Sequence, residues 1–138
     1  MIVLDTNVIS ETFRPTPDAG VLAWLDDQPR ESLFTTTPSV AEIRYGIVRL
    51  AKGRRRVQLM SLYEQMIGKF DQRILPFDFA AAEVFSELFV ERVKGGRSAG
   101  IFDLAIAAVA KSRGAAVATR NITHFDMIGI PVINPWSA

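Results

Sequence analysis

The feature that most constrains this chain is an apolar run, residues 1–4, that ends directly in Asp5. Such a run is typical of a buried strand, and burying an unpaired charge costs several kcal/mol. A carboxylate there is a poor core residue, but the end of a strand can present it as an anion at the edge of a sheet. Asp5 is therefore a candidate site residue, with capping of the following helix as the alternative interpretation.

A second carboxylate, Asp103, lies within residues 101–110, and all the remaining residues of this stretch are apolar. A helix of this composition is normally buried, so an aspartate near its start needs hydrogen bonds, a cation or a shifted pKa. The alternative is a first-turn aspartate that the helix dipole favours. Two carboxylates in unfavourable places call for a shared explanation, and we expect a common site.

Composition limits the chemistry that such a site could perform. The 138 residues, 49% of them hydrophobic, predict a single domain over residues 1–138 with one sizeable core. Without cysteine there is no disulfide, thiolate nucleophile or cysteine zinc site. One histidine cannot form a histidine cluster, so catalysis must depend on carboxylates, whose hard oxygens favour Mg²⁺ or Mn²⁺.

The net charge of +1 neither demands nor excludes a nucleic-acid partner. The chain has no basic leader followed by a long apolar segment, and no apolar stretch of the roughly 18 residues that cross a bilayer. We therefore expect no membrane association and a cytoplasmic location.

The order of apolar runs and breakers predicts an α/β fold, in which strands alternate with helices around a mainly parallel sheet. In such sheets the ligand site lies beyond the carboxyl ends of the strands, where Asp5, the 119–126 loop and the start of the Asp103 helix could meet. The expected strands are residues 2–5, 32–36, 74–77, 115–119 and 131–133, and the expected helices are residues 8–13, 19–27, 37–52, 55–70, 79–94 and 99–113.

Glu42 is the third candidate acid. It lies three residues after Ser39, a spacing typical of a capping box, and opposite an apolar stripe on its helix. From the spacing alone, a helix cap and a functional carboxylate both remain open.

These residues resemble a known family. Four motifs, residues 4–11, 39–46, 103–108 and 117–121, come in the order seen in PIN domains, and residues 134–136 add a resemblance to the FitB-like branch of the VapC toxins. The resemblance implies a PIN-like three-layer sandwich and a magnesium-dependent ribonuclease that cleaves by metal-activated water. Asp5, Glu42 and Asp103 are its implied catalytic and metal-binding acids, with Mn²⁺ as a possible substitute for Mg²⁺.

The chain departs from the family pattern at Asn121, where many members have an aspartate. An asparagine can ligate through its carbonyl oxygen but supplies no charge, and Asp126 could compensate unless it is a solvated loop residue. Thr6 and Thr119 are expected to support the acids by hydrogen bonding, although threonine is also common at strand ends.

Basic residues near two helix ends could follow an RNA backbone, and a solvated helix end is the alternative. His124 is expected in a loop, outside the site. The basic candidates are Lys52, Arg54, Arg55, Arg56 and Arg97.

The resemblance also implies partners: a cognate antitoxin, an RNA substrate, a homodimer, and a heterotetramer or larger assembly with the antitoxin. Two alternatives remain. One is a catalytically weak PIN-like module that binds RNA or protein, which Asn121 favours. The other is a phosphatase of the haloacid dehalogenase type with Asp5 as nucleophile, although that family usually has a second aspartate where this chain has Asn7.

Overall fold

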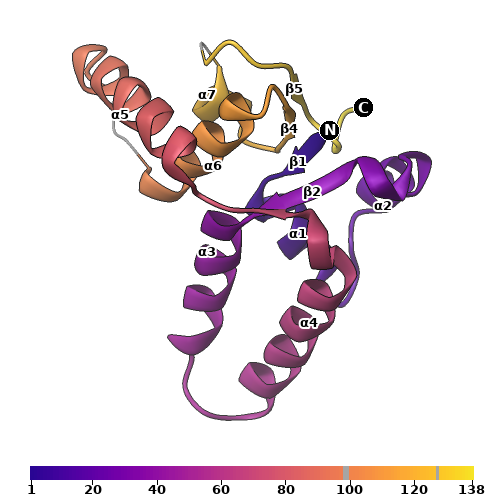
Figure 1. Cartoon of the computed structure of the whole chain (residues 1–138). Helices are drawn as coiled ribbons and strands as arrows, with labels where there is room; N and C mark the ends of the chain where they lie inside the picture. The colour runs from indigo at the N-terminus through magenta and orange to yellow at the C-terminus, as the bar shows by residue number, and fades with distance from the viewer. Residues whose placement is uncertain (98–99, 127) are drawn as a thin grey trace.

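The computed structural model describes residues 1–97, 100–126 and 128–138, which form a five-stranded, wholly parallel sheet with helices on both faces (Figure 1). The strand order is β3-β2-β1-β4-β5, so the first strand lies at the centre. The strands are β1 (Ile2–Leu4), β2 (Leu33–Thr36), β3 (Ile74–Leu75), β4 (Ala116–Ala118) and β5 (Val132–Ile133).

Helices cover the sheet in two layers, which confirms the predicted three-layer sandwich. Side chains alternate between the faces of a strand, so the neighbours Val3 and Leu4 of β1 enter different cores. Val3 packs with α5 (Phe79–Lys94) and α6 (Ile101–Ser112), whereas Leu4 packs with the other layer. That layer consists of α1 (Thr6–Thr12), α2 (Ala19–Asp27), α3 (Thr37–Val48) and α4 (Arg54–Phe70).

Several element boundaries differ from the predicted ones. The strand expected over 74–77 ends at Leu75 because Pro76 has no N–H to donate to the ladder. The helix expected over 37–52 ends at Val48, where the chain turns towards α4. The helix expected from residue 99 is observed from Ile101, and residue 99 itself lies outside the described residues.

One short helix was not predicted. Helix α7 (Ile122–Phe125) interrupts the segment expected as a loop, and its last residue, Phe125, is fully buried in the core beside α6. Within the described residues, no helix combines the length and apolar character that crossing a membrane requires.

Candidate active site

Asp5 lies at the carboxyl end of the central strand with both carboxylate oxygens held. The Thr6 backbone N–H donates to Oδ1 at 2.8 Å and the Thr119 hydroxyl donates to Oδ2 at 2.8 Å. Leu4 pairs with Ala118 across β1 and β4, so the residues that follow each strand, Asp5 and Thr119, are neighbours. Asp5 is also the N-cap of α1, so the capping interpretation is correct.

The buried carboxylate of Asp5 is electrostatically unfavourable as it stands. Burial raises its pKa from 3.8 to about 6 against the opposing Thr119 hydrogen bond, and repulsion from Asp103 and then Glu42 adds to the rise. Burial also raises the pKa of Glu42, opposed by the Thr6 hydroxyl and reinforced by Asp103. The three predicted acids therefore share one electrostatic environment although they come from β1, α3 and α6.

Glu42 is not used as a helix cap. The N-cap of α3 is Thr36, whose Oγ1 accepts from the Ser39 backbone N–H at 3.1 Å. The proposed capping box between Ser39 and Glu42 is thus wrong, because the helix begins three residues earlier than such a box requires. Among the described residues, the buried Oε1 atom of Glu42 has no hydrogen-bond partner, which leaves it available to a ligand.

His124 belongs to the site, contrary to the prediction that placed it outside. Its Nδ1 atom lies 2.6 Å from Oδ2 of Asp103. Two features of α7 hold it there: the buried ring of Phe125 and a hydrogen bond from the Arg92 guanidinium to the carbonyl oxygen of His124. The apolar Phe125 directly after His124 was the sequence signal that this segment is anchored rather than a free loop.

Thr119 links several of the predicted supporting residues. Besides donating to Asp5, its Oγ1 accepts from the Asn121 backbone N–H at 2.9 Å and from Nδ2 of Asn7 at 3.4 Å. Asn121 therefore reaches the site through its backbone. The Thr6 hydroxyl lies close enough to Glu42 to lower its pKa, but in the described part of the chain its buried Oγ1 makes no hydrogen bond of good geometry.

The predicted basic residues fall into two structural situations. Arg97 binds Asp126, 3.1 Å from Nη1 to Oδ1, and also donates to the Thr123 carbonyl, so both Arg97 and Asp126 are engaged within the protein. In contrast, Arg54 and Arg55 are exposed in the first turn of α4. This is the helix end that disfavours cations, so a favourable dipole contact does not explain them. Lys52 is exposed ahead of α4, and Arg56 approaches the Leu50 carbonyl at 3.4 Å.

The donor set suits a hard divalent cation. Three carboxylates that repel one another and an unpartnered Glu42 oxygen are features that a bound cation would relieve. In the described residues, however, no three side chains of the His, Asp or Glu type form a cluster that could hold a metal ion as they stand. The residues therefore fit Mg²⁺ by their chemistry rather than as a preformed cage.

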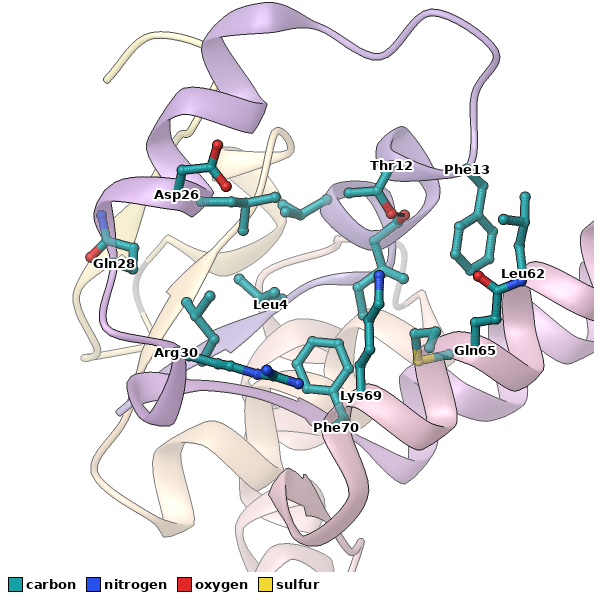
Figure 2. Close-up of a pocket in the computed structure, with 15 residues that line it drawn as sticks. Leu4, Thr12, Phe13, Asp26, Gln28, Arg30, Leu62, Gln65, Lys69 and Phe70 are labelled. Carbon is teal, nitrogen blue, oxygen red and sulfur yellow. Dashed lines mark hydrogen bonds between the residues drawn. The ribbon is translucent and has the colours of Figure 1, made fainter.

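Two cavities lie near this region. The larger, about 430 Å³, is a mainly apolar groove between α1, α2 and α4, and Figure 2 shows side chains that line it, among them Phe13, Leu62 and Phe70. None of the three acids lines it. The smaller, about 240 Å³, lies between α1, α3 and α4, and Glu42 and Thr6 contribute to its wall.

Comparison with known proteins identifies the family. The family model described as "PIN domain" matches residues 2–128. The chain belongs to the PIN-domain family. This PIN domain is 40% identical over 137 residues to "VapC ribonuclease Y4jK" of Sinorhizobium fredii, covering 99% of this chain and 98% of the relative. It is 39% identical to "Toxin FitB" of Neisseria gonorrhoeae, with 99% of each chain covered.

A solved structure agrees with the fold. The chain of "FitAcB from Neisseria gonorrhoeae" superposes on this PIN domain with a TM-score of 0.90 at 38% identity, covering 100% of both chains. The predicted relationship to the VapC and FitB proteins is thereby confirmed.

Proposed function

We propose that this PIN domain is the toxin of a type II toxin–antitoxin module and a magnesium-dependent endoribonuclease acting in the cytoplasm. The observation that carries the proposal is the electrostatic coupling of Asp5, Glu42 and Asp103 at the carboxyl edge of the sheet. The full-length similarity to proteins named as a VapC ribonuclease and as Toxin FitB supports it. The catalytically weak binding module remains the alternative that the experiment below tests.

The three acids share one part in the proposed reaction, and Asp5 and Glu42 each have a further one. Asp5, Glu42 and Asp103 would hold Mg²⁺, or Mn²⁺ in its place, which when bound supplies Lewis-acid chemistry that acidifies water and offsets charge on the phosphoryl oxygens. Asp5 is fixed at both oxygens and so contributes a rigid negative charge. Glu42 Oε1, which lacks a donor among the described residues, accepts the proton of the attacking water.

Attack by water leaves the RNA 2′-hydroxyl unused. In-line displacement of the 3′ oxygen then gives a 5′-phosphate on one product and a 3′-hydroxyl on the other. A phosphatase that uses Asp5 as nucleophile finds less support, because position 7, where that family usually has a second aspartate, carries an asparagine whose Oδ1 accepts from the Arg120 backbone N–H at 3.3 Å.

The larger cavity is the surface that we assign to an antitoxin segment. It is a mainly apolar groove, and a solved structure that is 28% identical to this chain, with a TM-score of 0.69, is described as a member of the VapBC family of toxin-antitoxin systems. Lys69 and Arg30 on the wall of the groove could pair with acidic residues of such a segment. A homodimer, and a heterotetramer or larger assembly with the antitoxin, are part of the same proposal.

Cleavage of total cellular RNA by purified, antitoxin-free protein tests the nuclease. We expect discrete products with Mg²⁺ or Mn²⁺, none with chelator, and none from Asp5→Ala or Asp103→Ala. Asp126→Ala is the matched control, because its carboxylate binds Arg97 and it should still cleave. Products that end in 2′,3′-cyclic phosphate would contradict the mechanism, and no cleavage by folded, metal-bound protein would favour the binding module.

A further inference from the structure

We propose that the smaller cavity binds one nucleotide of single-stranded RNA, directly beside the phosphodiester that is cut. This α1–α3–α4 cavity is defined by Thr6, Phe13, Arg14, Glu42, Gly46 and Arg55. The proposal rests on the proposed ribonuclease function and deepens it by assigning a substrate subsite.

The position of the cavity connects it to the reactive centre. Glu42 and Thr6 line it, and each carries a buried oxygen that has no hydrogen-bond partner among the described residues. Glu42 is one of the three coupled acids, and Thr6 follows Asp5 in the chain. A nucleotide in the cavity would therefore be the neighbour, along the RNA chain, of the phosphodiester that lies at the acids.

Two cations line the same cavity from different elements. Arg14 follows the C-cap of α1 with 63% of its side chain exposed, and its contact with Glu11 is a long 3.4 Å. Arg55 is exposed in the first turn of α4 and forms no ion pair within the described part of the chain. The Arg55 guanidinium is thus available to the phosphates of a bound strand, which supply most of the affinity for nucleic acid, and the exposed Arg14, paired with Glu11, adds positive charge beside it.

The rest of the wall suits a nucleobase. Phe13 and Leu59 offer aromatic and aliphatic surface, and single-stranded RNA is commonly held by unstacked bases that pack against such side chains. At about 240 Å³ the cavity is smaller than the pockets of roughly 300–1,000 Å³ that enclose whole drug-sized ligands. One base, with its phosphates left outside on the arginines, matches this size.

The charge of the cavity favours RNA over a protein segment as its occupant. Arg14 and Arg55 suit the phosphates of RNA, and the larger, mainly apolar groove of Figure 2 offers a protein segment a better surface than this small cavity does. The antitoxin is accordingly an outcome of the test rather than the proposed ligand.

Gly46 provides a direct way to close the cavity. It lies within α3, and a Cβ atom built on it meets no other atom within 4 Å, so a larger side chain would extend into open space without disturbing the core. Gly68 is the matched control, because it lies within α4, has equally open surroundings, and is absent from the walls of both cavities. Both changes to leucine should raise helix propensity alike.

The experiment measures binding apart from cleavage. Fluorescence anisotropy of a labelled single-stranded RNA oligonucleotide, with Mg²⁺, is recorded in an Asp5→Asn background that cannot cleave. We expect Gly46→Leu to weaken binding tenfold or more and Gly68→Leu to leave it within twofold. Thermal unfolding and circular dichroism verify that both variants are folded.

A second pair of variants tests the cations. Arg55→Ala should weaken binding several-fold and lower the slope of log Kd against log salt by about 0.7, the value for one phosphate contact with a single strand. Arg54→Ala, which removes the neighbouring exposed arginine that does not line the cavity, should change the slope much less.

The outcomes separate this proposal from the one on which it rests. If the chain with Asp5 intact cleaves RNA but Gly46→Leu and Gly68→Leu bind equally, the subsite is refuted and the nuclease stands. If the chain neither cleaves nor binds RNA, the proposed function fails and the subsite with it. If Gly46→Leu retains RNA binding but no longer co-purifies with a co-expressed antitoxin, the cavity binds the protein partner and the proposal is overturned.

Discussion

The imidazole of His124 and the carboxylate of Asp103 are joined by a 2.6 Å contact between Nδ1 and Oδ2. The contact is a hydrogen bond when Nδ1 carries the ring proton and Oδ2 accepts it, an arrangement that leaves the other ring nitrogen for a different partner. The contact links α7 to α6 and fixes the direction of the Asp103 side chain. His124 is thus a positioning residue for one of the three acids.

Replacing His124 should reveal this role. His124→Ala leaves Asp103 without its donor, and loss of such an outer partner typically lowers metal affinity or activity by about 10- to 100-fold. His124→Asn can keep a donor near the Nδ1 position and should retain more of both. Calorimetric titration with Mn²⁺ and RNA cleavage provide the two readouts, and equal Mn²⁺ affinity in the alanine and unmodified proteins would contradict the role.

The burial of Asp5 predicts a specific dependence of stability on pH. Its folded pKa, about 6, is above the unfolded value of 3.8, so the folded state binds the proton more tightly. Protonation of Asp5 therefore stabilises the folded state. This stabilisation is fully present below pH 3.8 and is lost as the pH rises through 6, and it amounts to at most about 3 kcal/mol at 1.36 kcal/mol per pKa unit. Denaturant unfolding with chelator between pH 4 and pH 7 measures it.

Asp5→Asn should remove much of that dependence. The amide has no charge to desolvate, so the metal-free variant should be more stable than the unmodified protein at pH 7 and show a flatter profile over pH 4–7. Added Mg²⁺ should raise the melting temperature of the unmodified protein more than that of the variant. An unchanged slope in Asp5→Asn would show that the pH dependence arises elsewhere.

Thr119 supplies the hydrogen bond that opposes the rise in the Asp5 pKa. Thr119→Val keeps the shape of this fully buried side chain but removes the donor, so we expect the Asp5 pKa to rise further. It also leaves the Asn121 N–H without its acceptor, for a total destabilisation of about 1–3 kcal/mol. A pH–rate profile displaced to higher pH would be the signature, and Thr119→Ser should restore the original profile.

Phe125 should couple stability to the site. Its side chain is fully buried, and truncation of such a phenylalanine costs about 3–5 kcal/mol. Because Phe125 anchors the helix that carries His124, Phe125→Ala should also weaken Mn²⁺ binding at temperatures where the protein is still folded. Phe125→Leu, which retains most of the apolar contact, should affect both less, and Mn²⁺ affinity that is insensitive to either change would separate the anchor from the site.

The sequence was informative where local rules are strong. An apolar run followed by Asp5, and a later strand followed by Thr119, are enough to predict that the two side chains meet, because the ends of parallel strands share an edge. The layer arrangement could also be predicted, because strands that alternate with helices form a parallel sheet covered by helices.

The contact between His124 and Asp103 could not be predicted from the sequence. Helix α7 has only four residues, too few for a periodic apolar pattern, and its position depends on the packing of Phe125 and on the Arg92 hydrogen bond. The interpretation of Glu42 turned on the exact start of α3, which a threonine three residues before Ser39 decides. Both answers depend on tertiary structure or on single-residue boundaries.

The central position of β1 has a consequence for synthesis of the protein. In the order of synthesis Asp5 precedes its hydrogen-bond donor Thr119 by 114 positions, and His124 comes later still. The nascent chain therefore cannot complete the acid cluster until Thr119 and His124 have been translated and have folded against β1 and α6. The strand that carries the first acid is thus made long before the partners that fix that acid in place.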